Sequence, residues 1–178
     1  MRPAEFFAAL GPQATDAQRR TGIPASITLA QAAIESAWGE SRLAVEGKNL
    51  FGIKAGKGWK GPVLQMPTRE YIGKEWRTVL APWRVYPNWQ ASMEDHARFL
   101  LENPRYTPAL RLVDHPRAFA SALQTCGYAT DPDYADKLRA VMDKHGLARF
   151  DVPRSQWALA DWVSLPPALA PPDAEANA

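Results

Sequence analysis

The chain has 178 residues, enough for about one domain with a buried core. Hydrophobic residues make up 46% of it and charged residues 22%, which excludes wholesale disorder. The formal charge is only +2, and we expect the charges to be spread too evenly to form the basic stripe of a protein that binds duplex DNA. Nucleic acid is therefore not an expected partner. The single cysteine, Cys126, excludes an intrachain disulfide and a cysteine-based zinc site.

The N-terminal residues lack the features of a secretory signal, because their apolar run is short and contains Glu5. No stretch of the sequence approaches the roughly 20 apolar residues of a membrane span. We therefore expect the chain to be made in the cytoplasm without a signal peptide, and we expect no membrane insertion.

The first third of the chain predicts two helices. Residues 3–21 carry apolar side chains at helical spacing, and Gly11 and Pro12 predict an interruption in the middle. Pro24 suits the first turn of a second helix, which we expect to end at Gly39. The second helix is rich in alanine, so neighbours can approach it closely and a central, buried position is expected.

The middle of the chain, residues 45–87, is rich in glycine and lacks helical periodicity. Segments 63–72 and 76–86 flank Gly73-Lys74, which predicts a β-hairpin turn. Prolines in both segments favour short, exposed edge strands. The expected structure is a small, mobile β lobe.

Helices are predicted again after the lobe. Asn88 is a good N-cap for a helix whose apolar face includes His96. Asp114 is expected to cap the next helix, and Asp131-Pro132 to open a last one that ends at Gly146.

Beyond residue 150 the composition shifts to proline and alanine without an amphipathic period. We therefore divide the chain into a folded domain, residues 1–150, and an extended tail, residues 151–178. Trp157 and Trp162 are the tail residues that could dock on the domain.

The residue types and motifs in the sequence leave catalysis by carboxylates as the main option. The sequence has no Gly-rich phosphate loop and no His-Glu-x-x-His zinc helix, and His96 is more typical of a satisfied core histidine than of a ligand. Glu35 lies among small and apolar residues near a helix end, where desolvation would raise its pKa and keep it protonated as a general acid. The alternative is an ordinary glutamate on a solvated face with Gln31 as its polar companion. The β lobe offers Glu70 and Glu75 as a second carboxylate.

Seven blocks of sequence occur in an order and at spacings that resemble one family. They are Ala-Ala-Ile-Glu-Ser-Ala-Trp-Gly-Glu-Ser at 32–41, Asn-Leu-Phe-Gly-Ile-Lys at 49–54, Trp-Lys-Gly-Pro at 59–62, Thr-Arg-Glu-Tyr at 68–71, Trp-Arg-Val-Tyr at 83–86, Asn-Pro-Arg-Tyr at 103–106 and Gly-Tyr-Ala-Thr-Asp-Pro-Asp-Tyr-Ala at 127–135. Over roughly residues 3–147 the chain is similar to the glucosaminidases of glycoside hydrolase family 73.

This resemblance implies an α+β, lysozyme-like fold, with a mainly helical body and a small β-hairpin lobe flanking a substrate groove. It implies cleavage of peptidoglycan by an endo-β-N-acetylglucosaminidase that needs no cofactor and no metal. By position, Glu35 matches the general acid, Glu70 the base or stabilising carboxylate, and Tyr128 the tyrosine that supports the cleft.

The same resemblance implies substrate contacts for Asn49, Phe51 and Tyr134, which stand in matched blocks. Trp59 is a further candidate, because an indole face can stack on a sugar ring. The expected partner is the glycan strand, and the expected state is a monomer.

Two other functions remain open from the sequence. A lytic transglycosylase would share the fold but use one glutamate and form an anhydro sugar, whereas a wall-binding or assembly module would not turn over substrate. The preferred role is that of a phage or prophage endolysin, which would reach the periplasm and the cell wall after holin-type or other non-classical release.

Overall fold

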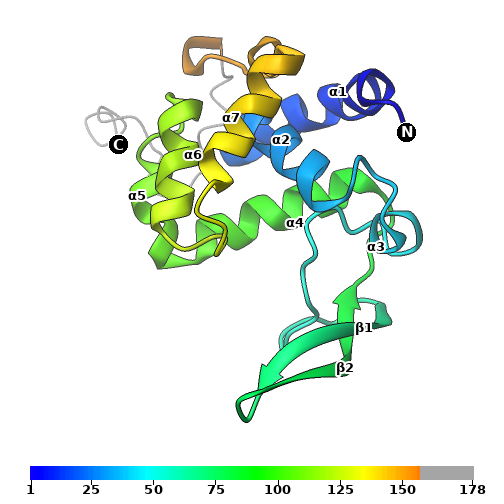
Figure 1. Ribbon diagram of the computed structural model, residues 1–178. Coiled ribbons are helices and arrows are strands. Elements are labelled where there is room, and N and C mark those ends of the chain that lie inside the picture. The colour runs from blue at the N-terminus through cyan, green and yellow to red at the C-terminus, as the bar shows by residue number, and fades with distance from the viewer. Residues whose placement is uncertain (157–178) are drawn as a thin grey trace, which may run out of the picture.

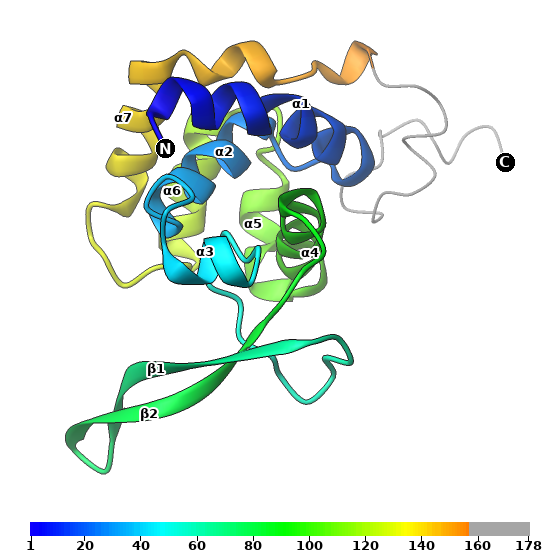
Figure 2. The same ribbon diagram turned by 90° about the vertical axis from the view of Figure 1, so that its right-hand side faces the viewer.

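The computed structural model describes residues 1–156, with the backbone alone for residues 70–72 and 155. Trp157 and Trp162 of the predicted tail lie outside the described residues. A body of packed helices carries a two-stranded antiparallel sheet that projects from it (Figures 1 and 2). The predicted α+β architecture, a mainly helical body with a small β-hairpin lobe, is confirmed.

The elements follow one another in an order that inserts the hairpin between two groups of helices. They are α1 (Pro3–Thr21), α2 (Ala25–Glu35), α3 (Arg42–Glu46), β1 (Val63–Ile72), β2 (Glu75–Arg84), α4 (Trp89–Glu102), the 3-10 turn η1 (Pro104–Tyr106), α5 (Thr107–Leu110), α6 (Pro116–Thr125), α7 (Tyr134–His145), η2 (Leu147–Phe150) and η3 (Arg154–Gln156). No helix among the described residues is long and apolar enough to cross a membrane.

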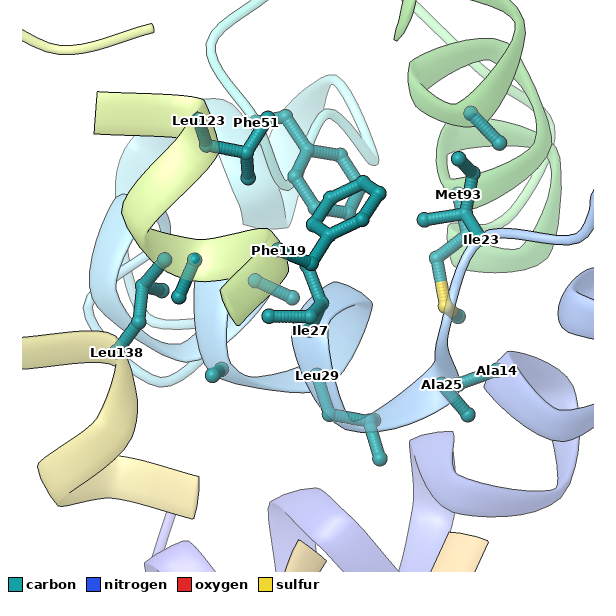
Figure 3. Packing of buried hydrophobic residues seen from close by; sticks show 14 of the residues in the cluster. Ala14, Ile23, Ala25, Ile27, Leu29, Phe51, Met93, Phe119, Leu123 and Leu138 are labelled. Carbon is teal, nitrogen blue, oxygen red and sulfur yellow. The ribbon is translucent and has the colours of Figure 1, made fainter. Parts of the chain in front are cut away.

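Helix α2 lies at the centre of the body, as its alanine-rich sequence predicts. It packs against α1, α6 and α7, and its residues from Ala25 to Ala33 are all buried. Figure 3 shows Ile27 and Leu29 of α2 in a core that also contains Phe119 of α6 and Leu138 of α7. Because α2 is held on several sides, the residue at its end has a well-defined position.

Helix α1 runs without a break through Gly11 and Pro12, so the predicted interruption is wrong. Proline removes one helical hydrogen bond, but Leu10 and Ala14 on either side are fully buried and hold both halves of the helix against the core. The ring of Phe150 packs directly on Gly11. A Cβ atom added to this glycine would lie 2.1 Å from a carbon of that ring, so a larger residue does not fit.

Helix α2 ends at Glu35, four residues before the predicted end at Gly39. The backbone turns because Ala37 and Trp38 adopt left-handed conformations, with φ of 50° and 60°. Edge-to-face contacts with Phe6 and Phe7 hold the Trp38 ring in place, at centroid distances of 6.0 and 5.6 Å. Core packing therefore ends the helix and leaves Glu35 at its C-terminal end.

The hairpin turn at Gly73-Lys74 is confirmed, and β1 has the bounds of the predicted segment 63–72, while β2 covers most of the predicted segment 76–86. Both strands are ten residues long, so the expectation that the prolines keep them short is wrong. Pro67 stands opposite Leu80, and Pro82 opposite Gln65. A two-stranded sheet has two edges, where backbone N–H groups face away from the partner strand. Proline is tolerated at such positions, so it does not shorten the strands.

An ion pair anchors the base of the hairpin to helix α4. Arg84 at the end of β2 donates to Asp95 at 2.6 Å, and Tyr86 donates to the same carboxylate oxygen at 2.7 Å. The Arg84 guanidinium also lies 4.9 Å from the ring centre of Trp59. Asp95 is only 7% exposed, so these contacts tie the lobe to the interior of the body.

Of two predicted helix starts, the cap at Asn88 is confirmed and the cap at Asp114 is wrong. Asn88 caps α4 by accepting a hydrogen bond from the Ala91 amide, which confirms the prediction. Asp114 does not cap α6, whose N-cap is His115, because its carboxylate pairs with Arg154 at 2.9 Å. That contact joins residues 40 positions apart and is invisible to a local pattern.

Helix α7 begins at Tyr134, two residues after the predicted opening at Asp131-Pro132. Asp131 instead forms a local turn by accepting from the Asp133 amide at 2.9 Å. The predicted end at Gly146 is confirmed, because this glycine is the C-cap with φ 58°.

Candidate active site

A cleft of about 750 Å³ opens between the helical body and the base of the hairpin lobe. Its walls come from the end of α2, the segment 51–56, Arg84 of β2, helix α4 and the loop that leads into α7. Glu35, Phe51, Tyr128 and Tyr134 all line it. The fold therefore brings together four of the seven residues that the sequence nominated.

Glu35 occupies the C-terminal end of α2, where its side chain is open to the cleft. The surrounding protein removes part of its hydration, and this desolvation raises the pKa of the Glu35 carboxyl above its usual value. A hydrogen bond from Tyr134 acts in the opposite direction and is the weaker influence. The result is a carboxyl group that binds its proton more tightly than a solvated glutamate and remains accessible to a ligand.

Gln31 and Tyr134 form a short chain of hydrogen bonds that ends at Glu35. Gln31 Nε2 donates to the Tyr134 hydroxyl oxygen at 2.9 Å, and that hydroxyl donates to Glu35 Oε1 at 3.5 Å. An amide N–H can only donate, so the tyrosine hydrogen is left for the carboxylate. Gln31 is fully buried one turn before Glu35, so the two residues do not share the solvated face of the alternative, and Gln31 acts through Tyr134 instead.

Tyr128 is held between two other side chains of the cleft. Its hydroxyl lies 2.8 Å from His96 Nε2, and its ring stacks on Tyr134 with centroids 5.5 Å apart. Burial lowers the pKa of His96 to about 3, so this imidazole is neutral. The ring of Phe51 stacks on the face of His96, with ring centroids 4.0 Å apart. The core histidine expected from the sequence is therefore buried and also part of the cleft wall.

Arg105 and Tyr106 are cleft residues that the sequence analysis left without a role. Arg105 donates to the Tyr106 hydroxyl at 2.6 Å and to the Gly127 carbonyl at 2.7 Å, which links two segments of the wall. The signal that could have found them is the block Asn-Pro-Arg-Tyr at 103–106, where the tyrosine is 1% exposed.

Asn49 and Trp59 lie outside the set of residues that line the cleft. Asn49 is 1% exposed, and its amide joins both connections of the lobe by donating to the carbonyls of Ile53 and Arg84 at 2.9 and 3.0 Å. The Trp59 indole donates to the Pro62 carbonyl at 2.9 Å, and Arg84 covers its ring. Both side chains shape the base of the lobe, and their substrate contacts stay predictions.

Glu70 lies on β1, three positions before the hairpin turn and opposite Arg77 of β2 in the backbone register. This places it on the lobe rather than on the body that carries Glu35. Among the residues whose side chains are described, the second carboxylate that lines the cleft is Asp131. A hydrogen bond from Lys137 lowers the pKa of Asp131, so that carboxylate is ionised and paired.

The described side chains of the cleft suit proton transfer and sugar binding. Among the side chains that the structure describes, no group of three or more His, Cys, Asp and Glu is arranged to hold a metal ion. A proton donor, neutral tyrosine hydroxyls and aromatic rings are the groups that the cleft offers. Such a combination can bind a carbohydrate and protonate one of its oxygens.

Comparison with protein families identifies one that spans most of the chain. The profile of the glucosaminidase family, described as mannosyl-glycoprotein endo-beta-N-acetylglucosaminidase, matches residues 11–147. The peptidoglycan hydrolase FlgJ of Salmonella typhimurium is 40% identical over 144 residues, which cover 79% of this chain and 45% of that protein. The exo-glucosaminidase LytG of Bacillus subtilis is 43% identical over 131 residues, or 71% of this chain and 45% of LytG.

Solved structures include the same architecture. The catalytic domain of the autolysin Auto from Listeria monocytogenes superposes with a TM-score of 0.76 at 31% identity, and the match covers 84% of this chain and 87% of that domain. The chain spans about half the length of the curated relatives it matches, because those relatives are longer. The similarity therefore concerns one catalytic-domain fold within larger proteins.

Proposed function

The chain belongs to the glucosaminidase family, glycoside hydrolase family 73, and on that premise we propose that it hydrolyses the glycan strand of peptidoglycan as an endo-β-N-acetylglucosaminidase. The observation that carries the proposal is Glu35, an accessible carboxyl with a raised pKa in the cleft between body and lobe. The names of the relatives, a peptidoglycan hydrolase and an exo-glucosaminidase, support the substrate class.

Glu35 acts as the general acid. Its proton passes to the glycosidic oxygen while the bond from that oxygen to C1 of N-acetylglucosamine breaks, so the leaving sugar departs as a neutral alcohol. A proton donor must stay within hydrogen-bond reach of that oxygen throughout the step. The end of α2 suits this task, because helices on several sides hold it in place.

Glu70 acts on the developing positive charge at C1. It either takes a proton from the water that attacks C1 or stabilises the ring formed when the acetamido oxygen of the substrate attacks first. Water is consumed in both routes, so the product is a reducing sugar. Placement on the hairpin allows this carboxylate to approach after a glycan strand has entered the cleft.

Tyr134, which is 3% exposed, positions Glu35, and the partly exposed Tyr128 supplies aromatic surface for a sugar ring. Tyr134 donates to Glu35 and stacks on Tyr128, so a shift of either ring displaces the proton donor. Phe51 and His96, which are 6% and 1% exposed, stack on each other and support this wall from the protein side. Pyranose rings present C–H faces that pack well on such surfaces, which supports a carbohydrate ligand.

Digestion of purified peptidoglycan, followed by borohydride reduction and mass analysis, tests the proposal. Reduced N-acetylglucosamine ends are expected within oligosaccharide fragments, which indicates hydrolysis at internal bonds. Release of only terminal sugars would identify an exo-acting enzyme, as the name of LytG suggests for that relative. Anhydro ends would identify a lytic transglycosylase, and no release at all would favour a wall-binding module.

The domain boundaries and the biological role are further proposals. We assign catalysis to residues 1–150, which is supported by the family match over residues 11–147. We propose an endolysin-like role at the cell wall, tested by directing the chain to the periplasm of a host with an added export signal. Lysis by the wild type and not by Glu35→Gln is the expected result.

A further inference from the structure

Charge is distributed unevenly between the two parts of the molecule. The hairpin lobe, defined here as residues 54–84, carries seven lysines and arginines and two glutamates. Residues 1–53 and 85–156 together carry fourteen basic and fourteen acidic residues. The expectation of evenly spread charge is therefore wrong, because the body is balanced and the lobe has an excess of five positive charges.

Most of these cations are available to a ligand. Lys57, Lys60, Arg69, Lys74 and Arg77 are exposed. In the body, Lys137 and Arg139 of α7 pair with Asp131 and Asp136, whereas Lys57, Lys60 and Lys74 of the lobe have no carboxylate partner among the side chains that the structure describes. Unpaired surface lysines in one small element produce a positive potential that attracts anions.

The base of the lobe forms part of the cleft wall. It contributes Lys54, Gly56 and Arg84 to that wall, and Lys57 follows Gly56 in the chain. Ten residues per strand at about 3.3 Å per residue make the hairpin about 30 Å long. In Figure 2 it extends from the body as an arm. Substituents of a glycan strand that leave the cleft on this side therefore meet basic residues.

The geometry points to the hairpin lobe as a binding surface for the carboxylates of the peptides attached to the glycan strand. This inference rests on the proposed function, because the glycan must lie in the cleft for its peptides to reach the lobe. Peptides on alternate sugars carry free carboxylates, and a mobile lysine suits a ligand whose anions vary in position. Trp76 adds apolar surface near the turn, being 63% exposed.

Binding to insoluble peptidoglycan tests the inference without catalysis. The protein carries Glu35→Gln to prevent cleavage, and it is sedimented with peptidoglycan freed of phosphate-containing polymers. Converting the peptide carboxylates to neutral amides with carbodiimide and ammonia is expected to weaken binding about tenfold at low salt. Lys57→Gln/Lys60→Gln/Lys74→Gln is expected to weaken binding to native peptidoglycan to the same degree and to add nothing on the amidated form.

A matched control changes the same number of charges on the body. Arg19, Arg111 and Lys144 are exposed and do not line the cleft, so their combined change to glutamine is expected to leave binding unchanged. Equal binding of native and amidated peptidoglycan, or equal loss in the lobe and control variants, overturns the inference. So does binding that depends on phosphate polymers rather than on peptide carboxylates. Failure of the wild type to cleave peptidoglycan refutes the proposed function and leaves this binding result interpretable.

Discussion

The helical body and the hairpin lobe differ in how their side chains are held. In the body, α1 and α2 bury residues such as Phe6, Leu10 and Ile27 completely, and each helix packs against others. In the lobe, Trp76 and Leu80 are 63% and 68% exposed, and the two strands form a two-stranded sheet to which a bridge between Lys54 and Trp83 is added at the base. Side chains of the body can therefore hold a fixed position, whereas those of the lobe can adapt to a ligand.

The two proposed carboxylates are divided between these regions. Glu35 ends the most enclosed helix of the body, and Glu70 stands near the tip of the lobe. A proton donor loses efficiency when its distance to the glycosidic oxygen changes, whereas a group that stabilises charge at C1 tolerates more movement. We expect mutations in the body to reduce chemistry most strongly and those in the lobe to change binding and pH dependence.

The largest effect is expected for Glu35→Gln. The change removes the proton donor with almost no change in shape, and loss of a general acid typically lowers the rate about 100-fold to 10,000-fold. Release of reducing ends from purified peptidoglycan measures it. Turnover close to that of the wild type in a folded Glu35→Gln protein would falsify the assignment.

The same variant should not melt at a lower temperature at neutral pH. Burial raises the pKa of Glu35 in the folded protein, so its contribution to stability is present at low pH and is lost as the pH rises through that pKa. Above that pKa the ionised side chain opposes folding, and glutamine removes this cost; below it glutamine replaces a neutral carboxyl of nearly the same shape. Thermal melting at pH 7 checks that lost activity reflects chemistry.

Glu70→Gln is expected to have the next largest effect, a lower maximal rate and loss of the acidic limb of the pH profile. Glu70 must be ionised and Glu35 protonated, so the wild-type profile is bell-shaped, with Glu70 titrating on the acid side. Initial rates from pH 3 to 9 measure both limbs. Glu75→Gln is the matched control, because it removes a carboxylate of the same lobe and should retain the acidic limb.

An acidic limb that survives Glu70→Gln unchanged contradicts the assignment of the base. Asp131 is then the next residue to change, because it lines the cleft and its pairing with Lys137 keeps it ionised. Persistence of the limb in Asp131→Asn as well would leave the acetamido group of the substrate as the group that assists at C1.

Tyr134→Phe is expected to move the basic limb to higher pH. The Tyr134 hydroxyl donates to Glu35 and opposes the effect of burial, so its removal raises the pKa of Glu35 further and extends the range in which the acid is protonated. The substitution retains the other titratable groups that line the cleft, which are Lys54, Arg84, His96, Arg105, Tyr106, Tyr128 and Asp131.

Tyr106→Phe provides the control for this shift. Tyr106 is buried in the same wall, but its hydroxyl accepts from Arg105 and makes no hydrogen bond to Glu35. The position of the basic limb should therefore stay that of the wild type, whatever happens to the rate. An equal shift in both variants would indicate a general change of the cleft rather than a role for the Tyr134 hydroxyl.

Local sequence patterns predicted the elements of the fold where local chemistry decides them. The cap at Asn88, the turn at Gly73-Lys74 and the end at Gly146 depend on side chains and backbone within a few residues. The continuous α1 and the pairing of Asp114 with Arg154 depend on residues far apart in the chain. Packing of Phe150 on Gly11 is such a contact, and periodicity carries no information about it.

The sequence could predict which residues form the candidate site better than it could predict the hydrogen bonds between them. Helical spacing and a resemblance to the family nominated Glu35, Tyr128 and Tyr134, which the fold brings into one cleft. The hydrogen bond from Gln31 spans 103 residues, so the sequence could name a polar companion but not its partner. Asn49 belongs to a block that the resemblance assigns to the groove, yet its amide donates to the carbonyls of Ile53 and Arg84, in the two segments that connect the lobe to the body.

The smallest effect is expected from removing the part of the tail that follows Gln156. Its proline and alanine composition has no amphipathic face, so we expect unchanged specific activity and a melting temperature within a few degrees of the wild type. A cut after Phe150 is the comparison, because it also removes Asp151 and Val152, which hydrogen-bond to Ser26 and Gln18 and contribute about 1 kcal/mol per bond. This shorter chain should melt lower. If the cut after Gln156 leaves a folded protein that cannot cleave peptidoglycan, the tail contributes to the groove, and its tryptophans become candidates for substrate contacts.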